Sequence, residues 1–226
     1  MLLTIPNVLD GAAVEHFRAR LDAAEWEDGR RTTGYLAARV KHNAQLAEDH
    51  PVAAELGEHI LAALERNPLF ISAALPHRVF PPMFNRYGPG QTFGTHVDTA
   101  LRQPIGQPRR LRCDLSATLF LSDPASYAGG ELTIEDSYGA HAVKLAPGDM
   151  VLYPASSLHR VEPVAEGVRL AAIFWVQSMV RDDPARAMLY DLDSAIQHLG
   201  VAVPDHPAVT QLTGVYHNLL RRWAEV

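Results

Sequence analysis

The chain has 226 residues, of which 47% are hydrophobic and 20% charged, and its formal net charge at pH 7 is −6. This composition is typical of a soluble globular protein and excludes a disordered chain, a coiled coil and a collagen-like repeat. The acidic balance gives no electrostatic basis for binding nucleic acid, and no apolar run reaches the roughly 18–20 residues that a membrane span needs.

Three features of the sequence bear on location and on metal binding. The N-terminal segment MLLTIPNVLDG has neither a basic region nor a long apolar stretch, which argues against a secretory signal. The single cysteine, Cys113, excludes an intrachain disulfide and fits a reducing compartment, so we expect a cytoplasmic protein. The chain also has 11 histidines, and because histidine is the commonest metal ligand, histidines with ligand spacing are the first site candidates.

Helices are predicted in the N-terminal part of the chain. Residues 10–26 carry an apolar stripe at helical spacing after the candidate N-cap Asp10, and a second helix is predicted from Pro51 to about Arg66. Between them, residues 29–49 predict a loop with one short strand over residues 35–40.

After Pro76 the chain consists of short apolar segments separated by Gly and Pro turn signals. This pattern predicts an antiparallel β sandwich or barrel, because no helix-length segment separates the strands as a parallel sheet requires. The predicted strands are 79–87, 92–99, 115–121, 131–135, 141–145, 150–153, 159–161 and 168–176.

The helical pattern returns after Asp183, which is a candidate N-cap followed by Pro184. This helix is predicted to end at Gly200, and a last helix covers residues 207–223. The apolar stripes of the two helices predict a hairpin that packs on itself and on the β core. A homo-oligomer formed through these helices is the alternative.

A His-x-Asp triplet, His96-Val97-Asp98, lies in one of the predicted strands. Side chains two residues apart on a strand leave the same face, with Cα atoms roughly 6.6 Å apart, so the imidazole and the carboxylate can converge on one metal ion. Alone, the triplet is also typical of a surface strand with a charge-assisted hydrogen bond.

A second histidine, His159, lies beside a later strand of the same β region. Two histidines and one carboxylate on one face of a metal are the ligand set of non-haem Fe(II) oxygenases, which leaves positions open for a co-substrate and O₂. By itself, His159 also fits a hydrogen-bonded histidine in a turn.

Arg169 is the fourth candidate, because the apolar run LAAIFWV follows it and its guanidinium therefore enters a core. If a turn is centred near Val164, His159 and Arg169 lie opposite each other on one sheet face, with Cβ atoms roughly 5 Å apart. A buried arginine needs an anionic partner. Near a metal, the parallel N–H groups of its guanidinium fork would suit a carboxylate of a small dianionic co-substrate. The alternative is an edge-strand arginine with a surface salt bridge.

These residues resemble those of the Fe(II)/2-oxoglutarate-dependent dioxygenases, and in particular the prolyl-4-hydroxylase-type branch, in which NRYG (residues 85–88) is a familiar segment. Further segments are similar to the bacterial PKHD-type hydroxylases linked to iron uptake, and with the helical C-terminal tail they cover nearly the whole chain. These segments are VKHNAQL (40–46), LSATLFLS (115–122), GGEL (129–132), PGDMVLYP (147–154) and SSLH (156–159).

The resemblance implies a mainly β fold with flanking helices, a double-stranded β-helix (jelly roll) with N-terminal helices and a C-terminal helical hairpin. It divides the chain into an N-terminal helical segment over residues 1–77 that packs on the core, a jelly-roll domain over 78–178, and a C-terminal helical extension over 183–226.

The resemblance also implies a cofactor set and a role for each candidate residue. Fe(II), one per chain, would be bound by His96, Asp98 and His159, while Arg169 would bind the distal carboxylate of 2-oxoglutarate. O₂ is the other co-substrate, and ascorbate dependence is implied as well. Tyr87 would hydrogen-bond 2-oxoglutarate, although a core tyrosine at a strand end is an equal alternative.

The expected function is hydroxylation of a substrate carbon with decarboxylation of 2-oxoglutarate to succinate. The prolyl-hydroxylase likeness suggests a peptide or prolyl substrate, and the iron-uptake association suggests an iron chelator of the siderophore type. A cupin-like metal-binding protein, or a sensor without turnover, is the alternative. The arginine-rich loop over residues 99–113 is either a lid for an anionic substrate or a solvated surface loop.

Overall fold

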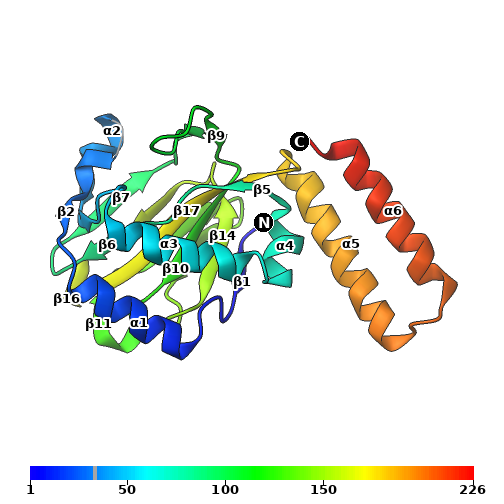
Figure 1. Ribbon diagram of the computed structural model, residues 1–226, viewed down its shortest axis with the longest axis horizontal. Coiled ribbons are helices and arrows are strands. Elements are labelled where there is room, and N and C mark those ends of the chain that lie inside the picture. The colour runs from blue at the N-terminus through cyan, green and yellow to red at the C-terminus, as the bar shows by residue number, and fades with distance from the viewer. Residues whose placement is uncertain (33–34) are drawn as a thin grey trace.

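The computed structural model describes residues 1–32 and 35–226, and it consists mainly of antiparallel strands with helices at both ends (Figure 1). Two sheets face each other, and every strand pairing among the described residues is antiparallel. The predicted jelly roll with flanking helices is therefore confirmed.

The large sheet has eight strands in the order β1, β14, β10, β17, β6, β4 and β2, with β5 paired to β17. The first strands in the chain belong to it, so the N-terminal segment contributes strands as well as helices to the core. The strands are β1 (Leu3–Ile5), β2 (Glu27–Asp28), β4 (Ala44–Gln45), β5 (Pro76–Val79), β6 (Met83–Tyr87), β10 (Leu115–Phe120), β14 (Met150–Pro154) and β17 (Arg169–Ser178).

The small sheet has five strands in the order β13, β12, β15, β7 and β3, and two separate pairs, β11 with β16 and β8 with β9, complete the β structure. The strands of the small sheet are β3 (Lys41–His42), β7 (Thr92–His96), β12 (Leu132–Asp136), β13 (Gly139–Val143) and β15 (His159–Val161). The separate pairs are formed by β8 (Leu101–Arg102), β9 (Leu111–Arg112), β11 (Tyr127–Gly129) and β16 (Val164–Gly167), and two 3₁₀ turns cover Gly29–Thr32 and Pro124–Ser126.

The side chains of the large sheet point alternately to its two faces. One face packs in a core with the helices, and the other lines a pocket between the two sheets. On β10, Leu115, Ala117 and Leu119 pack in the outer cluster with residues of α1 (Gly11–Asp22) and α3 (Pro51–Leu64). Because successive strand residues point to opposite faces, Ser116 and Thr118 point between the two sheets. The helices thus cover one face, and the other face is left to form a site.

The helix starts follow the capping signals in the sequence. The Asp10 side chain accepts a hydrogen bond from the Ala13 amide at 2.8 Å, as predicted for the start of α1, although this helix ends at Asp22 rather than at residue 26. Helix α4 (Pro68–Ala74) was not predicted, yet it carries the same kind of signal, an Asn67 cap followed by proline.

Two strand predictions are wrong in the structure. Residues 35–40 do not form a strand: Tyr35–Ala38 form the short helix α2, and Leu, Ala and Arg in this segment are good helix formers. The predicted strand over 79–87 is divided into β5 and β6 around Pro81 and Pro82, because proline cannot donate to a β ladder.

The C-terminal helices α5 (Asp183–Ala202) and α6 (Pro207–Trp223) form an antiparallel hairpin that extends away from the β sheets (Figure 1). Asp182, not Asp183, caps α5, and Gly200 lies inside this helix rather than ending it. An exposed helix tolerates glycine at a cost of about 1 kcal/mol, which explains why the helix continues. No helix in the described ranges has the length and hydropathy required to cross a membrane.

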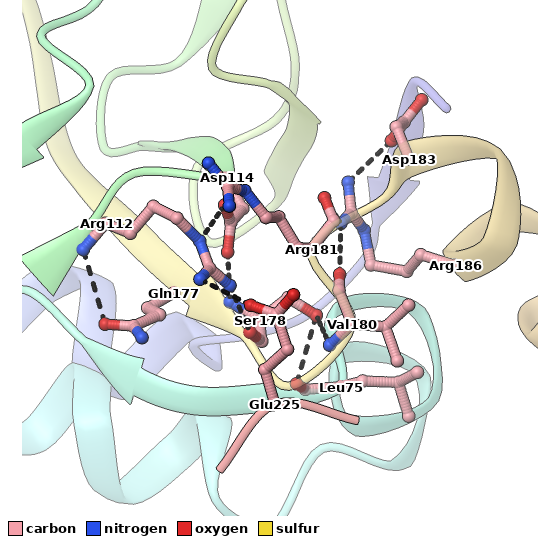
Figure 2. Close-up of polar contacts among 10 residues, drawn as sticks. All are labelled: Leu75, Arg112, Asp114, Gln177, Ser178, Val180, Arg181, Asp183, Arg186 and Glu225. Carbon is pink, nitrogen blue, oxygen red and sulfur yellow. Dashed lines mark hydrogen bonds and ion pairs between the residues drawn. The ribbon is translucent and has the colours of Figure 1, made fainter. Parts of the chain in front are cut away.

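A polar network fixes the base of this hairpin to the β core (Figure 2). Arg112 donates to Asp114 at 2.7 Å and to Glu225 at 2.9 Å, so it joins the start of β10 to the end of the chain. Arg186, 1% exposed, donates to the Val180 carbonyl at 2.8 Å and to Asp183 at 2.6 Å. The orientation of the hairpin base is therefore set by charged hydrogen bonds, of which the one from Arg186 to the Val180 carbonyl is buried.

Candidate active site

Two neighbouring strands of the small sheet bring the His-x-Asp triplet and the second histidine together. His159 at the start of β15 lies opposite His96 at the end of β7. Their ring centroids are 4.2 Å apart, and His159 Nε2 lies 3.7 Å from Asp98 Oδ2. One ligand atom from each of the three residues lies within 4.8 Å of the others, so the three side chains could hold one metal ion.

Hydrogen bonds to backbone carbonyls orient the two imidazole rings. His96 Nδ1 lies 2.8 Å from the Gly94 carbonyl, and His159 Nδ1 lies 3.1 Å from the Ser157 carbonyl. A carbonyl can only accept, so each ring carries its proton on Nδ1 and leaves Nε2 free for a metal. Burial, with a smaller effect of the His159 charge, lowers the pKa of His96 to about 4, which keeps this ring neutral at pH 7.

The Asp98 carboxylate has a supporting hydrogen bond of its own. Ser116 Oγ donates to Asp98 Oδ2 at 2.5 Å, and Ser116 belongs to β10 on the opposite sheet. The sequence analysis missed this serine, although a polar residue in the otherwise apolar strand LSATLF was a usable signal.

We expect Ser116→Ala to weaken metal binding about 10- to 100-fold, as is typical when a group that orients a metal ligand is lost. Calorimetric titration with Fe(II) under anaerobic conditions measures the effect. Ser126→Ala, at an exposed turn, is the matched control and should bind as the wild type does. Unchanged affinity in Ser116→Ala would mean that the hydrogen bond does not position Asp98.

Arg169 lies on the large sheet, at the start of β17, and is 1% exposed. Its guanidinium carbon is 5.4 Å from the Tyr87 ring centre and 5.3 Å from that of Phe120. Its Nε and Nη2 atoms are buried and have no hydrogen-bond partner among the described residues. These two atoms form one edge of the guanidinium fork, so the site fits a carboxylate bound by two parallel hydrogen bonds.

The predicted hairpin between His159 and Arg169 is wrong. After β15 the chain forms β16, which pairs with β11, and only then enters β17 of the large sheet. His159 and Arg169 therefore lie on facing sheets rather than on adjacent strands, and they line the same pocket from its two sides. The pocket encloses about 750 Å³, including its open mouth.

Three tyrosines surround the Arg169 end of the pocket. Tyr87 is directly opposite Arg169 in the β6–β17 register, and burial raises its pKa to about 12. Tyr153 is fully enclosed, and burial also raises its pKa well above the usual value. The Tyr127 hydroxyl is buried beside the Arg169 guanidinium, and the Tyr127 ring and the Arg169 stem both lie against Gly130. All three are neutral donors at pH 7, and only Tyr87 was predicted.

Two further cations, Lys41 and Arg102, line the same pocket. Lys41 lies in the segment VKHNAQL, which is similar to the PKHD-type hydroxylases, but neither Lys41 nor Arg102 was predicted as a residue of the active site. Arg102 is the one arginine of the 99–113 loop that reaches the pocket; Arg109 and Arg110 are exposed, and Arg112 belongs to the network at the hairpin base.

The comparisons with known proteins agree with this geometry. Residues 82–177 match the 2OG-Fe(II) oxygenase superfamily, and residues 183–225 match the PKHD-type hydroxylase C-terminal domain. A PKHD-type hydroxylase of Pseudomonas putida is 58% identical over 226 residues, and one of Bordetella pertussis is 56% identical, each over the whole of both chains. The chain belongs to the PKHD-type hydroxylase family.

As a PKHD-type hydroxylase of the 2OG-Fe(II) oxygenase superfamily, the protein is a 2-oxoglutarate-dependent dioxygenase, and the family implies Fe(II) and 2-oxoglutarate. Among solved structures, a Pseudomonas putida prolyl-4-hydroxylase matches with a TM-score of 0.56 at 22% identity over 78% of this chain and 92% of that one. A Trichoplax adhaerens prolyl hydroxylase in complex with a hypoxia-inducible-factor peptide matches with a TM-score of 0.58 at 14% identity, over 83% and 86%. At these identities the matches support the jelly-roll fold of the PKHD-type hydroxylase.

Proposed function

We propose that this hydroxylase acts on a carbon of a peptide or prolyl group, or of an iron chelator of the siderophore type, and converts 2-oxoglutarate to succinate. The site assignment rests on the buried Arg169 fork, whose Nε and Nη2 have no hydrogen-bond partner in the described ranges. This fork lies in the same pocket as His96, Asp98 and His159, which could hold a metal ion. A metal-binding protein without turnover has no use for a second, buried anion site.

In this proposal the chain's own residues bind and orient the reactants. His96 and His159 each present an Nε2 atom, and Asp98 adds a carboxylate oxygen, which together suit Fe(II). Fe(II), when bound, supplies the redox chemistry that activates O₂. Arg169 binds the distal carboxylate of 2-oxoglutarate and so fixes its orientation in the pocket.

The hydroxyl groups near Arg169 have a distinct role in the proposal. Tyr87 and Tyr127 remain protonated at pH 7 and donate hydrogen bonds toward the anion that Arg169 binds. Burial raises the pKa of both tyrosines, so they contribute no competing negative charge. The two apolar sheet faces exclude water from the bound co-substrate.

The family resemblance supports further proposals about the protein in the cell. We propose that it is cytoplasmic, that ascorbate sustains its activity and that it serves iron uptake. We also keep the division into residues 1–77, 78–178 and 183–226 as a proposal. Homo-oligomer formation through the C-terminal helices is supported by Met188, Leu199 and Val215, whose apolar side chains are exposed there.

The test is succinate formation from 2-oxoglutarate with Fe(II), ascorbate and O₂, combined with a mass-shift screen of substrates. We expect slow succinate release without substrate, and at least a severalfold stimulation with a +16 mass product for one of the two substrate classes. Proline-containing peptides and iron chelators are screened in parallel. If the Fe(II)-loaded protein forms no succinate with any of them, a metal-binding or sensor role replaces the proposal.

A further inference from the structure

The pocket holds two cations that neither the metal cluster nor the 2-oxoglutarate site uses. Lys41 on β3 is 2% exposed, and its Nζ donates to Gln45 Oε1 at 2.8 Å and to Thr32 Oγ1 at 3.3 Å. Both partners are neutral, and no described carboxylate lies within ion-pair distance of this ammonium. A buried cation with only neutral partners is costly unless something anionic joins it.

Arg102 reaches the pocket from the β8–β9 pair. Its guanidinium carbon lies 4.1 Å from the Trp175 ring centre and 5.0 Å from that of Phe80. Its one described carboxylate partner is Glu48, at a long 3.6 Å. The flat faces of the guanidinium are thus packed on aromatic rings, and its Nη2 also donates to Met83 Sδ at 3.6 Å, which leaves Nε and Nη1 for a ligand.

The two cations act on the same region of the pocket. Lys41 Nζ lies 5.3 Å from the Phe93 ring centre, and the Phe93 ring stacks on His96 with centroids 3.6 Å apart. Both side chains line the same pocket, and burial, with a smaller effect of the Arg102 charge, lowers the pKa of Lys41 to about 8. Lys41 still carries its proton at pH 7.

This pair is separate from the 2-oxoglutarate site. Trp175, on which Arg102 packs, lies six residues along β17 from Arg169, which corresponds to about 20 Å of strand. The five-carbon chain of 2-oxoglutarate, held at Arg169, cannot reach Arg102. An anion bound at Arg102 must therefore belong to another molecule, and Lys41 lines the same pocket.

The charges of the pocket indicate how many negative charges that molecule brings. A divalent metal, the Asp98 carboxylate, dianionic 2-oxoglutarate and Arg169 together are neutral. Lys41 and Arg102 add two positive charges, and Glu48 offsets one of them. One positive charge remains, which a single carboxylate would neutralise.

We propose that the substrate carries a carboxylate that Lys41 and Arg102 bind, and that the carbon to be hydroxylated lies a few bonds from it. The inference rests on the proposed function and narrows its substrate class. Because Trp175, Met83, Phe93 and Ile173 line the pocket beside the two cations, the substrate has an apolar carbon skeleton. The carboxylate orients this skeleton toward the metal cluster.

The test compares acids with their own primary amides. The full chain is loaded with Ni(II), which replaces Fe(II) without turnover, and saturated with 2-oxoglutarate so that Arg169 is occupied. N-acetyl-L-proline, hexanoate and phenylacetate are each titrated by calorimetry beside N-acetyl-L-prolinamide, hexanamide and phenylacetamide. We expect at least one acid to bind about tenfold or more tightly than its amide, as a charge-assisted hydrogen bond predicts.

Variants of the two cations localise the effect. In Lys41→Met and in Arg102→Met the ratio of acid to amide affinity should fall to about one, whereas Arg109→Met, an exposed arginine between β8 and β9, should keep the wild-type ratio. The melting temperature of Lys41→Met should equal or exceed that of the wild type, since the substitution removes a buried cation. A lower melting temperature would show that Lys41 is a structural residue and would count against the proposal.

The outcomes separate this inference from the proposed function. If no acid binds more tightly than its amide, or if both cation variants keep the wild-type ratio, the carboxylate proposal is wrong. Succinate release by the Fe(II)-loaded wild type without substrate is measured in parallel. Its presence upholds the dioxygenase assignment whatever the acids do, and its absence counts against that assignment alone.

Discussion

Replacing His96 with alanine is expected to lower Fe(II) affinity by at least about 100-fold, because loss of one of three ligands exceeds the 10- to 100-fold effect of losing a supporting group. The remaining His159 and Asp98 ligand atoms lie 3.7 Å apart and offer only two sites. Anaerobic calorimetry with Fe(II), and with Ni(II) as a stable substitute, measures the loss. Succinate formation should disappear together with metal binding.

The control for this prediction is another histidine of the same fold. His77 on β5 is exposed, so His77→Ala should bind Fe(II) as the wild type does. The His96 ring stacks on Phe93, so a small decrease in melting temperature is expected in His96→Ala, with an unchanged circular dichroism spectrum. Full retention of metal in His96→Ala would overturn the ligand assignment.

The grouping of His96, Asp98 and His159 could be predicted from the sequence because most of it depends on residues that are close together in the chain. His96 and Asp98 are separated by one residue, and a strand at this point was predicted, although β7 ends at His96 and Asp98 follows it. Only one contact between distant segments, the pairing of β15 with β7, is then required to bring His159 to these two residues. The helix cap at Asp10 was predicted in the same way, since it depends on residues within one turn, whereas the equivalent signal at Asn67 was missed.

The rest of the pocket depends on contacts between distant segments. Arg169 was found from its apolar neighbours, but its position relative to His159 was wrong because the crossing between sheets cannot be read from the turn signals. Lys41 and Arg102 meet only when an edge strand and a separate hairpin approach the same pocket. Their charge can be read from the sequence, but their burial in one pocket exists only in the folded chain.

Replacing Arg169 with methionine is expected to have opposite effects on co-substrate binding and on stability. Removing one partner of a buried charge pair costs roughly 2–5 kcal/mol, which corresponds to about a 30-fold or larger rise in the 2-oxoglutarate dissociation constant. Without 2-oxoglutarate, the wild type buries an arginine whose Nε and Nη2 have no hydrogen-bond partner in the part of the chain that the structure describes. An apolar side chain of similar length should therefore leave the free energy of unfolding unchanged or raise it by about 1–4 kcal/mol.

Calorimetry with 2-oxoglutarate on the Ni(II)-loaded protein and denaturant unfolding of the metal-free protein measure the two effects separately. Ni(II) affinity should be unchanged, because Arg169 lies on the sheet opposite His96 and His159. Arg160→Met removes a partly exposed arginine that is paired with Glu135 and Glu162, so it tests the loss of a charge outside the pocket and should not change 2-oxoglutarate binding. Arg169→Lys keeps the charge without the fork, so an intermediate affinity would show that both charge and geometry contribute. Wild-type 2-oxoglutarate binding by Arg169→Met would place the anion site elsewhere in the pocket.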